Sequence, residues 1–283
     1  MASSVGVALF SAVALAIPSA ASAQAVLLQI RPHVGDTLHV RLDQDVEMTG
    51  MPAGCGSPAA NFRSRPRNPP ARCADIRNMN TRMEVFSRAI ARSSTRDATE
   101  MLAITDSVRT SSGKRGQGQP VVRQPTPRAP VEIRVSSDGG VEIGAGPASD
   151  EVRTLFVQMP ATLARKPIAV GEKWTREMRV PLTREPGATG TVRTTFHLDS
   201  LGRSGDVAYI SMRGVLSHAH SDGSTSETSG SLTGTMQLDR RLAWITDTFA
   251  IIDVWSVVKA GADGKPMNVH TRVTQSLKVT GSR

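Results

Sequence analysis

Hydrophobicity with a period of two residues runs through most of this chain, and it restricts the fold more than any other feature. In residues 269–279 every second residue is Val, Thr, Gln or Leu, and the residues between them are His, Arg, Thr, Ser and Lys. The same alternation covers residues 38–43, with Leu38, Val40 and Leu42 on one side. Successive side chains of a β-strand point to opposite faces of the sheet. The pattern therefore predicts strands with one apolar and one polar face.

Further stretches extend this prediction along the chain. Short turn signals such as Asp138-Gly139-Gly140 separate several of them, and strands joined by short turns pair antiparallel. We expect strands near residues 36–48, 82–92, 99–109, 131–136, 140–144, 171–181, 190–201, 206–219, 230–239, 242–258 and 266–280.

One helix is expected between these strands, over residues 149–164. Ser149 is a suitable N-cap, and acidic residues follow it in the first turn. Its apolar residues have the spacing of one helix face, and Pro160 ends or kinks the helix. These apolar residues are Val152, Leu155, Phe156 and Met159.

The chain also repeats itself loosely. Val34-Gly35-Asp36-Thr37-Leu38 begins the first half, and Val170-Gly171-Glu172-Lys173-Trp174 begins the second. Each is followed by similar hairpins in the same order. We therefore predict a mainly β fold, in which two similar half-sheets (24–148 and 165–283) are joined by the helix. Together they would form a curved antiparallel sheet or an open barrel.

The first 23 residues predict where the protein works. Val5–Ile17 is an apolar run without a charge, and Ala21-Ser22-Ala23 is the small-x-small pattern that signal peptidase cuts. We expect a signal peptide over residues 1–23 and a single β-rich domain over 24–283, located in the periplasm or secreted. No later stretch approaches about 20 apolar residues, so no transmembrane span is expected in the mature chain.

The two cysteines, Cys55 and Cys73, both lie in the exported part of the chain. In an oxidising compartment such a pair is expected to form a disulfide. The bridge would close a ring of similar size to a ~15-residue loop, for which the chain-entropy model gives about 3 kcal/mol.

Positive charge is concentrated in one region. The net charge of the whole chain is +9, and the sequence between Asn61 and Arg134 carries all of this excess. Two long segments in and around it, 49–80 and 111–130, are expected to be mobile basic loops. Basic clusters attract phosphate groups, so these loops could dock an anionic envelope surface. The densest cluster is Arg63, Arg65, Arg67 and Arg72.

His218-Ala219-His220 is the sharpest local chemical pattern. On a strand, His218 and His220 point to the same side, as two metal ligands would. The alternative is a pair of solvated histidines at a strand end. Ser111-Ser112-Gly113-Lys114 matches S-x-x-K by letters but lacks the helix and the later motifs that this chemistry requires. No cofactor motif is present, and we expect no cofactor.

The stretch Pro167-Ile168-Ala169-Val170-Gly171-Glu172-Lys173-Trp174 resembles a pattern, V-x-V-G-[DE]-x-W, of uncharacterised exported bacterial β-rich proteins. In those proteins the pattern starts the second half of the domain. At the level of fold, a curved sheet with a covering helix is similar to the LolA-type periplasmic lipoprotein carriers. This resemblance implies an architecture and transfers no binding residue.

These features lead to three hypotheses. The first is an exported, non-enzymatic protein that binds a lipid or another apolar or amphipathic ligand in the concave face of its sheet. Slim inward residues would leave space for it: Ser87, Ala89, Ala91, Ala208 and Gly214. The second is an envelope interaction or scaffold protein that docks through its basic loops. The third, and weakest, is a metal-dependent enzyme built on the histidine pair.

Two further expectations concern aromatic residues. Aromatic residues make up 4% of the chain, so stacking platforms for nucleic acid are scarce, and nucleic acid is not the expected partner. Trp174, Trp244 and Trp255 are expected in the hydrophobic core.

Overall fold

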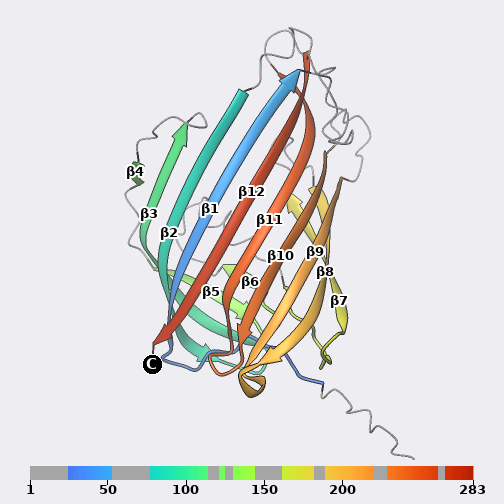
Figure 1. The fold of residues 1–283 in the computed structure, drawn as a ribbon. Coiled ribbons are helices and arrows are strands. Elements are labelled where there is room, and N and C mark those ends of the chain that lie inside the picture. The colour runs from blue at the N-terminus through green and yellow to red at the C-terminus, as the bar shows by residue number, and fades with distance from the viewer. Residues whose placement is uncertain are drawn as a thin grey trace, which may run out of the picture.

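The structure is a computed structural model that describes residues 25–52, 77–113, 121–124, 130–143, 161–181, 189–218, 228–260 and 265–282. These residues form one antiparallel sheet of twelve strands (Figure 1). The strands are β1 (Thr37–Pro52), β2 (Arg77–Ser94), β3 (Ala98–Gly113), β4 (Val121–Gln124), β5 (Val131–Ser136), β6 (Val141–Ile143), β7 (Lys173–Pro181), β8 (Thr189–Gly202), β9 (Val207–His218), β10 (Thr228–Asp239), β11 (Trp244–Ala260) and β12 (Lys265–Ser282). A short 3-10 helix, η2 (Arg203–Gly205), joins β8 to β9.

The strand order is β6-β5-β3-β2-β1-β12-β11-β10-β9-β8-β7, with β4 paired to the upper part of β3. Except for β4 and β5, and for β6 and β7, strands that follow one another in sequence are neighbours in the sheet. β1 joins the two halves by pairing with β12 over its whole length. Within the described residues β6 and β7 are the edges, and they do not pair with each other. The expected curved antiparallel β-sheet is confirmed, in its open form.

The strands are longer than the sequence pattern predicted. Residues 49–52 and 77–80 were expected in a mobile loop but belong to β1 and β2. Residues 111–113 end β3, and β4 lies inside the expected loop 111–130. Regular backbone pairing with a neighbouring strand extends these strands into segments with little hydrophobic alternation.

The expected helix over residues 149–164 falls largely outside the described residues. Its last four positions, 161–164, are described and are not helical. Leu163 and Ala164 are instead buried in the hydrophobic core, in an irregular segment that leads to β7. The prediction of helix is therefore wrong for these four residues, because their apolar side chains pack on the sheet without helical backbone.

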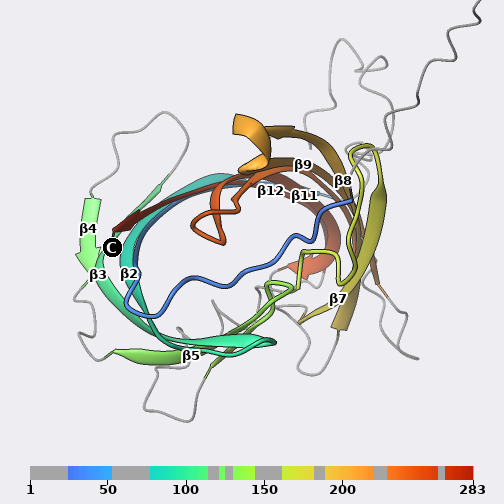
Figure 2. The same ribbon diagram turned by 90° about the horizontal axis from the view of Figure 1, so that it is seen from below.

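The sheet curves strongly about its long direction, which gives it a concave and a convex face (Figures 1 and 2). Two segments cross the concave side at its lower end in Figure 1, where β1 begins and β12 ends: residues 25–36 and residues 161–172. Backbone hydrogen bonds hold the first of them in place. Val26 pairs with Ile168, and Ile30 N donates to Ser137 O at 2.8 Å.

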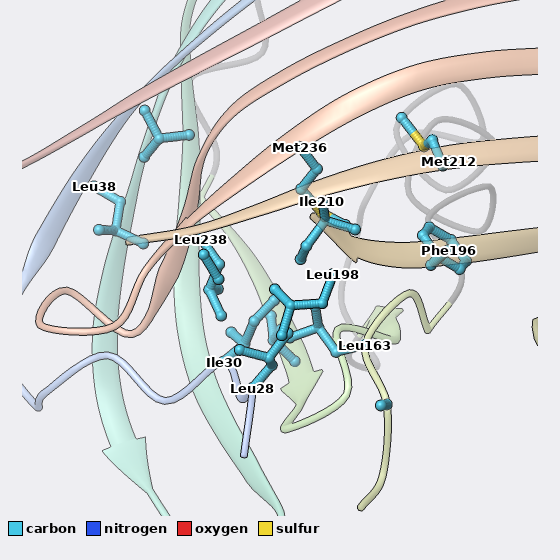
Figure 3. Close-up of a cluster of buried hydrophobic side chains, with 14 of the residues drawn as sticks. Leu28, Ile30, Leu38, Leu163, Phe196, Leu198, Ile210, Met212, Met236 and Leu238 are labelled. Atoms are coloured by element: carbon cyan, nitrogen blue, oxygen red, sulfur yellow. The ribbon is translucent and has the colours of Figure 1, made fainter. Parts of the chain in front are cut away.

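The hydrophobic core lies at this lower end, between the two crossing segments and the concave face (Figure 3). Leu28 and Ile30 come from the first segment, and Leu163 and Ile168 from the second. They pack against buried strand residues that include Leu38, Phe196, Leu198, Ile210, Met236 and Leu238. Because opposite residues of antiparallel strands share a face, this core shows which positions of every strand are concave.

The small inward residues have a different role from the one expected. Ala89, Ala91 and Ala208 belong to the buried core, so the space beside them is taken by the protein's own chain. Ala91 even exchanges backbone hydrogen bonds with Gly35 and Asp36. A Cβ atom on Gly214 would approach the Thr194 hydroxyl to 2.8 Å, so that position is also filled. A ligand therefore does not bind at these four positions.

Close backbone approach explains two glycines of β10. A Cβ atom at Gly230 would lie 2.6 Å from the Asp253 carbonyl oxygen, and one at Gly234 would lie 2.3 Å from the Phe249 carbonyl oxygen. Both carbonyls belong to the neighbouring strand β11, whose backbone cannot withdraw without losing its pairing. Glycine lets the sheet bend tightly here.

The two halves begin with the same turn. Gly35 and Gly171 both have positive φ, 94° and 90°. In each turn an acidic side chain, Asp36 or Glu172, accepts a hydrogen bond from the backbone N–H three residues before it, at 2.9 Å and 2.8 Å. Each glycine N–H also donates to a strand carbonyl, of Ala91 or of Leu198. This shared pattern supports the loose repeat seen in the sequence.

We predict that Leu28→Ala will lower the free energy of unfolding by about 2–5 kcal/mol, since the fully buried side chain leaves a cavity between the crossing segment and the sheet. The matched control is Leu27→Ala, whose side chain is 44% exposed and should change stability by less than about 0.5 kcal/mol. Urea denaturation of both variants measures this. Equal effects would show that the segment 25–36 does not form the core.

Candidate ligand-binding face

Above the core, the concave face continues for the rest of the strands without a covering segment among the described residues. We call the half-buried concave positions in this region the upper concave face. They alternate with the convex positions of the same strands, and the register puts them side by side across the sheet. They include Leu42, Gln44, Val46, Met48, Met83, Val85, Leu216, Leu232, Ile252, Val254, Thr271, Val273 and Gln275.

The upper concave face carries no charge. Ten of these thirteen residues are apolar, and the other three (Gln44, Thr271 and Gln275) are uncharged, as are the further half-buried concave residues Thr81 and Ser256. In β1, β2 and β8 to β12, the same register series reaches ionisable residues only at the upper strand ends. There Arg77 is opposite Gly50, His218 is opposite Gly190, and Lys265 is opposite Ala260. In β7 the series includes Arg176, opposite Thr194 of β8.

Charge is instead carried by the convex face of the same strands. Arg41 pairs with Asp43 at 2.9 Å, and Arg88 pairs with Asp106 at 2.9 Å across β2 and β3. On β12, Arg272 and His270 both face Asp253 of β11. One solvated polar face and one apolar face are typical of an antiparallel sheet that packs against something apolar. In the upper part of this sheet the described residues include nothing that fills that role.

The lower end of this face is closed by a buried polar network around Asp138, in the turn between β5 and β6. Its carboxylate accepts hydrogen bonds from the Ser136 hydroxyl at 2.6 Å and from Arg165 Nε at 2.9 Å, and it lies 3.3 Å from Arg176 Nη2 of β7. Arg176 also donates to the Leu163 carbonyl. Asp138 therefore links the edge of the sheet at β5 and β6 to the opposite edge at β7.

Two opposing effects set the protonation of Asp138. Burial raises the pKa of this carboxyl, but the hydrogen bond from Ser136 and the positive charges of Arg165 and Arg176 lower it by more. The net pKa lies below the ordinary value of 3.8. The carboxylate is thus stabilised in its charged form when the protein is folded.

The tryptophans divide between the two faces. Trp174 stacks on Phe196 with 5.5 Å between ring centroids, and its indole N–H donates to the Thr162 carbonyl at 2.7 Å. Trp244 also packs against the core, so the expectation is confirmed for both residues. Trp255 differs, because it stacks on His270 on the convex face and is not part of the core. Its place in the alternation of β11, opposite to that of Val254, accounts for this.

The histidines give no metal site that the structure describes. His218 is the last residue of β9, and its side chain and all of His220 lie outside the description. His197 faces the convex side, where its ring contacts Asp199 and the Gly171 carbonyl. Among the described residues no cluster of three or more His, Cys, Asp or Glu side chains could hold a metal ion.

The cysteine pair and the basic cluster also fall outside the described residues. Cys55, Cys73 and the four arginines between positions 63 and 72 belong to residues 53–76, so the disulfide and the basic docking site stay predictions. The described strand ends do show where this segment starts and finishes. Pro52, Arg77 and Gly113 all lie at the upper end of the sheet, as expected for strands that run up and down.

A separate pocket of about 390 Å³ is lined by residues 33–36, in the turn before β1. It lies outside the upper concave face. No helix among the described residues is long and apolar enough to cross a membrane.

Comparison with known proteins gives little further information. No family model and no curated protein matches the chain. Among solved structures, the chain is similar to lipovitellin, in a structure described as "lipid-protein interactions in lipovitellin". The TM-score is 0.49 and the sequence identity is 11%. The match covers 89% of this chain but 26% of the lipovitellin chain. A likeness this distant does not show what this chain binds.

We predict that Asp138→Asn will lower the free energy of unfolding by about 2–3 kcal/mol at neutral pH, since it leaves the mostly buried Arg176 without its counter-charge. The folded-state pKa of Asp138 is lowered, so its stabilisation is present above the unfolded value and is lost as pH falls below about 4. The wild-type protein should therefore lose more stability than the variant over that acid range.

The matched control is Asp97→Asn, which changes an exposed carboxylate in the neighbouring turn. Thermal or urea unfolding between neutral and acid pH measures all three proteins. A variant that keeps both the stability and the acid dependence of the wild type would contradict the role of Asp138 in joining the two edges.

Proposed function

We propose that this protein is an exported, non-enzymatic protein that binds an apolar or amphipathic ligand on its upper concave face. The observation that carries the proposal is the separation of charge between the two faces of one continuous sheet. The convex face is ion-paired, whereas the upper concave face has no ionisable residue and is only half buried.

Exposing this surface to water is unfavourable, because burial of apolar area is worth about 25 cal/mol per Å². The protein uses its own segments 25–36 and 161–172 to bury the lower part of the face. A ligand would bury the upper part in the same way. The face also offers few groups that could do chemistry, so binding accounts for it better than catalysis.

We predict that Val273→Glu will weaken binding of a fluorescent fatty acid at least about tenfold, because a carboxylate on this face must be desolvated when the ligand covers it. The matched control is Thr274→Glu, the next residue of β12, which falls on the convex face. Fluorescence titration of delipidated full-length protein measures the affinity, and circular dichroism verifies the fold. Equal affinities of the two variants would place the ligand elsewhere.

Export is part of the proposal, and it rests on the signal-like sequence before Gln24. We expect the protein recovered from the periplasm or the medium to begin at Gln24, because signal peptidase cuts after small-x-small. Mass analysis of the mature chain measures this. An intact chain found only in the cytoplasm would contradict export and leave the ligand-binding face untouched.

A further inference from the structure

We infer that the ligand of the upper concave face is a long-chain amphiphile, bound with its hydrocarbon tail toward the core and its polar head at the upper rim. The inference rests on the proposed function and adds the chemical class and the orientation of the ligand.

The first argument is the length of the uncharged region. From Leu42 to Gly50, β1 extends by about 26 Å at about 3.3 Å per residue. Over this length the concave positions of β1 and its partners on β2 and β12 include no ionisable residue until Arg77. A small apolar molecule would cover a fraction of such a strip, whereas an extended hydrocarbon chain matches its length and its lack of charge.

The second argument is that the strip is closed at one end. Val40 and Leu277 pack against the core at its base, and the crossing segments fill the space below them (Figures 2 and 3). The mostly buried Arg176 there is already paired with Asp138 and hydrogen-bonded to the Leu163 carbonyl, so its charge is compensated within the protein. A charged or strongly hydrated head bound there would lose its hydration without compensation.

The third argument is the composition of the open end. Arg77 and Lys265 are the residues at which the uncharged series ends, in β2 and β12. Both are the end residues of their strands, at the end of the sheet away from the core, where a polar head keeps its water. The uncharged strip and the position of these cations together give the ligand one favourable orientation, with the tail inward.

The orientation is tested with ligands that vary the tail and the head separately. Straight-chain fatty acids of about 8 to 18 carbons displace a fluorescent fatty acid from delipidated full-length protein. Affinity should rise about fourfold for each added methylene until the chain reaches the base of the strip. Alcohols and alkylphosphocholines of the same chain length should bind within about tenfold of the acid in about 0.5 M salt, which screens the charges of the rim.

A pair of variants tests where the tail lies. Val273→Trp places a large side chain on the strip partway up β12, and should weaken binding of the longest chains about tenfold or more while leaving the shortest unchanged. Thr274→Trp, its neighbour on the convex face, should leave the whole series unchanged. If Val273→Trp does not fold by circular dichroism, Val46→Trp makes the same test from β1, directly opposite Val273.

The outcomes separate this inference from the proposed function. If no member of the series displaces the probe and the probe itself does not bind, the proposed function fails. If the probe binds but affinity is independent of chain length, the ligand is not held tail-inward and the inference is overturned. The same follows if ligands with charged head groups bind more than about a hundredfold more weakly than alcohols of the same chain length.

Discussion

The packing of two irregular segments across one end of the curved sheet is the interaction on which the rest of this structure depends. A sheet with an apolar face must bury that face against another layer. Within the part of the chain that the structure describes, residues 25–36 and 161–172 supply that layer, and they do so at the lower end, through Leu28, Ile30, Leu163 and Ile168. The sheet is long enough that its upper half extends well beyond them, which leaves an uncharged concave surface above a solid core (Figure 1).

Polar groups keep the open sheet together at that end. The edges β6 and β7 do not pair, yet Asp138 reaches from one edge to Arg165 and Arg176 on the other side. The two glycine turns before β1 and β7 fix the crossing segments to β2 and β8, through hydrogen bonds from the glycine N–H groups to the carbonyls of Ala91 and Leu198.

The sequence predicted the strands well because alternation and turn residues are local signals. Leu38, Val40 and Leu42 fall on the concave face as their spacing indicated, and the glycine turns at positions 35 and 171 occur in both halves. The crossing segments were not predicted, because Leu28 and Ile30 lie in a short stretch without clear periodicity. For the same reason, alternation alone predicts free space beside Ala89, Ala91 and Ala208, although the chain itself fills it.

The sequence predicted an apolar, ligand-binding face of the sheet, but not the position of that face along the strands. Alternation alone indicates an apolar face, whereas the part of that face left uncovered depends on contacts between residues far apart in sequence. Asp138 and Arg176 are 38 positions apart, and nothing local marks either as a partner of the other. Trp255 shows the same limit, since an aromatic residue expected in the core lies on the convex face beside His270.

The central claim is that hydrocarbon binds on the concave face and not on the apolar residues of the convex face. Methyl NMR with a fatty acid that carries a spin label on its tail tests it most directly, because the label broadens only nearby signals. Broadening of the methyl groups of Leu42, Val46 and Val273, with those of Val215 and Ile251 unchanged, is the result that this account predicts. Broadening of Val215 and Ile251 with the concave methyl groups unchanged would contradict it.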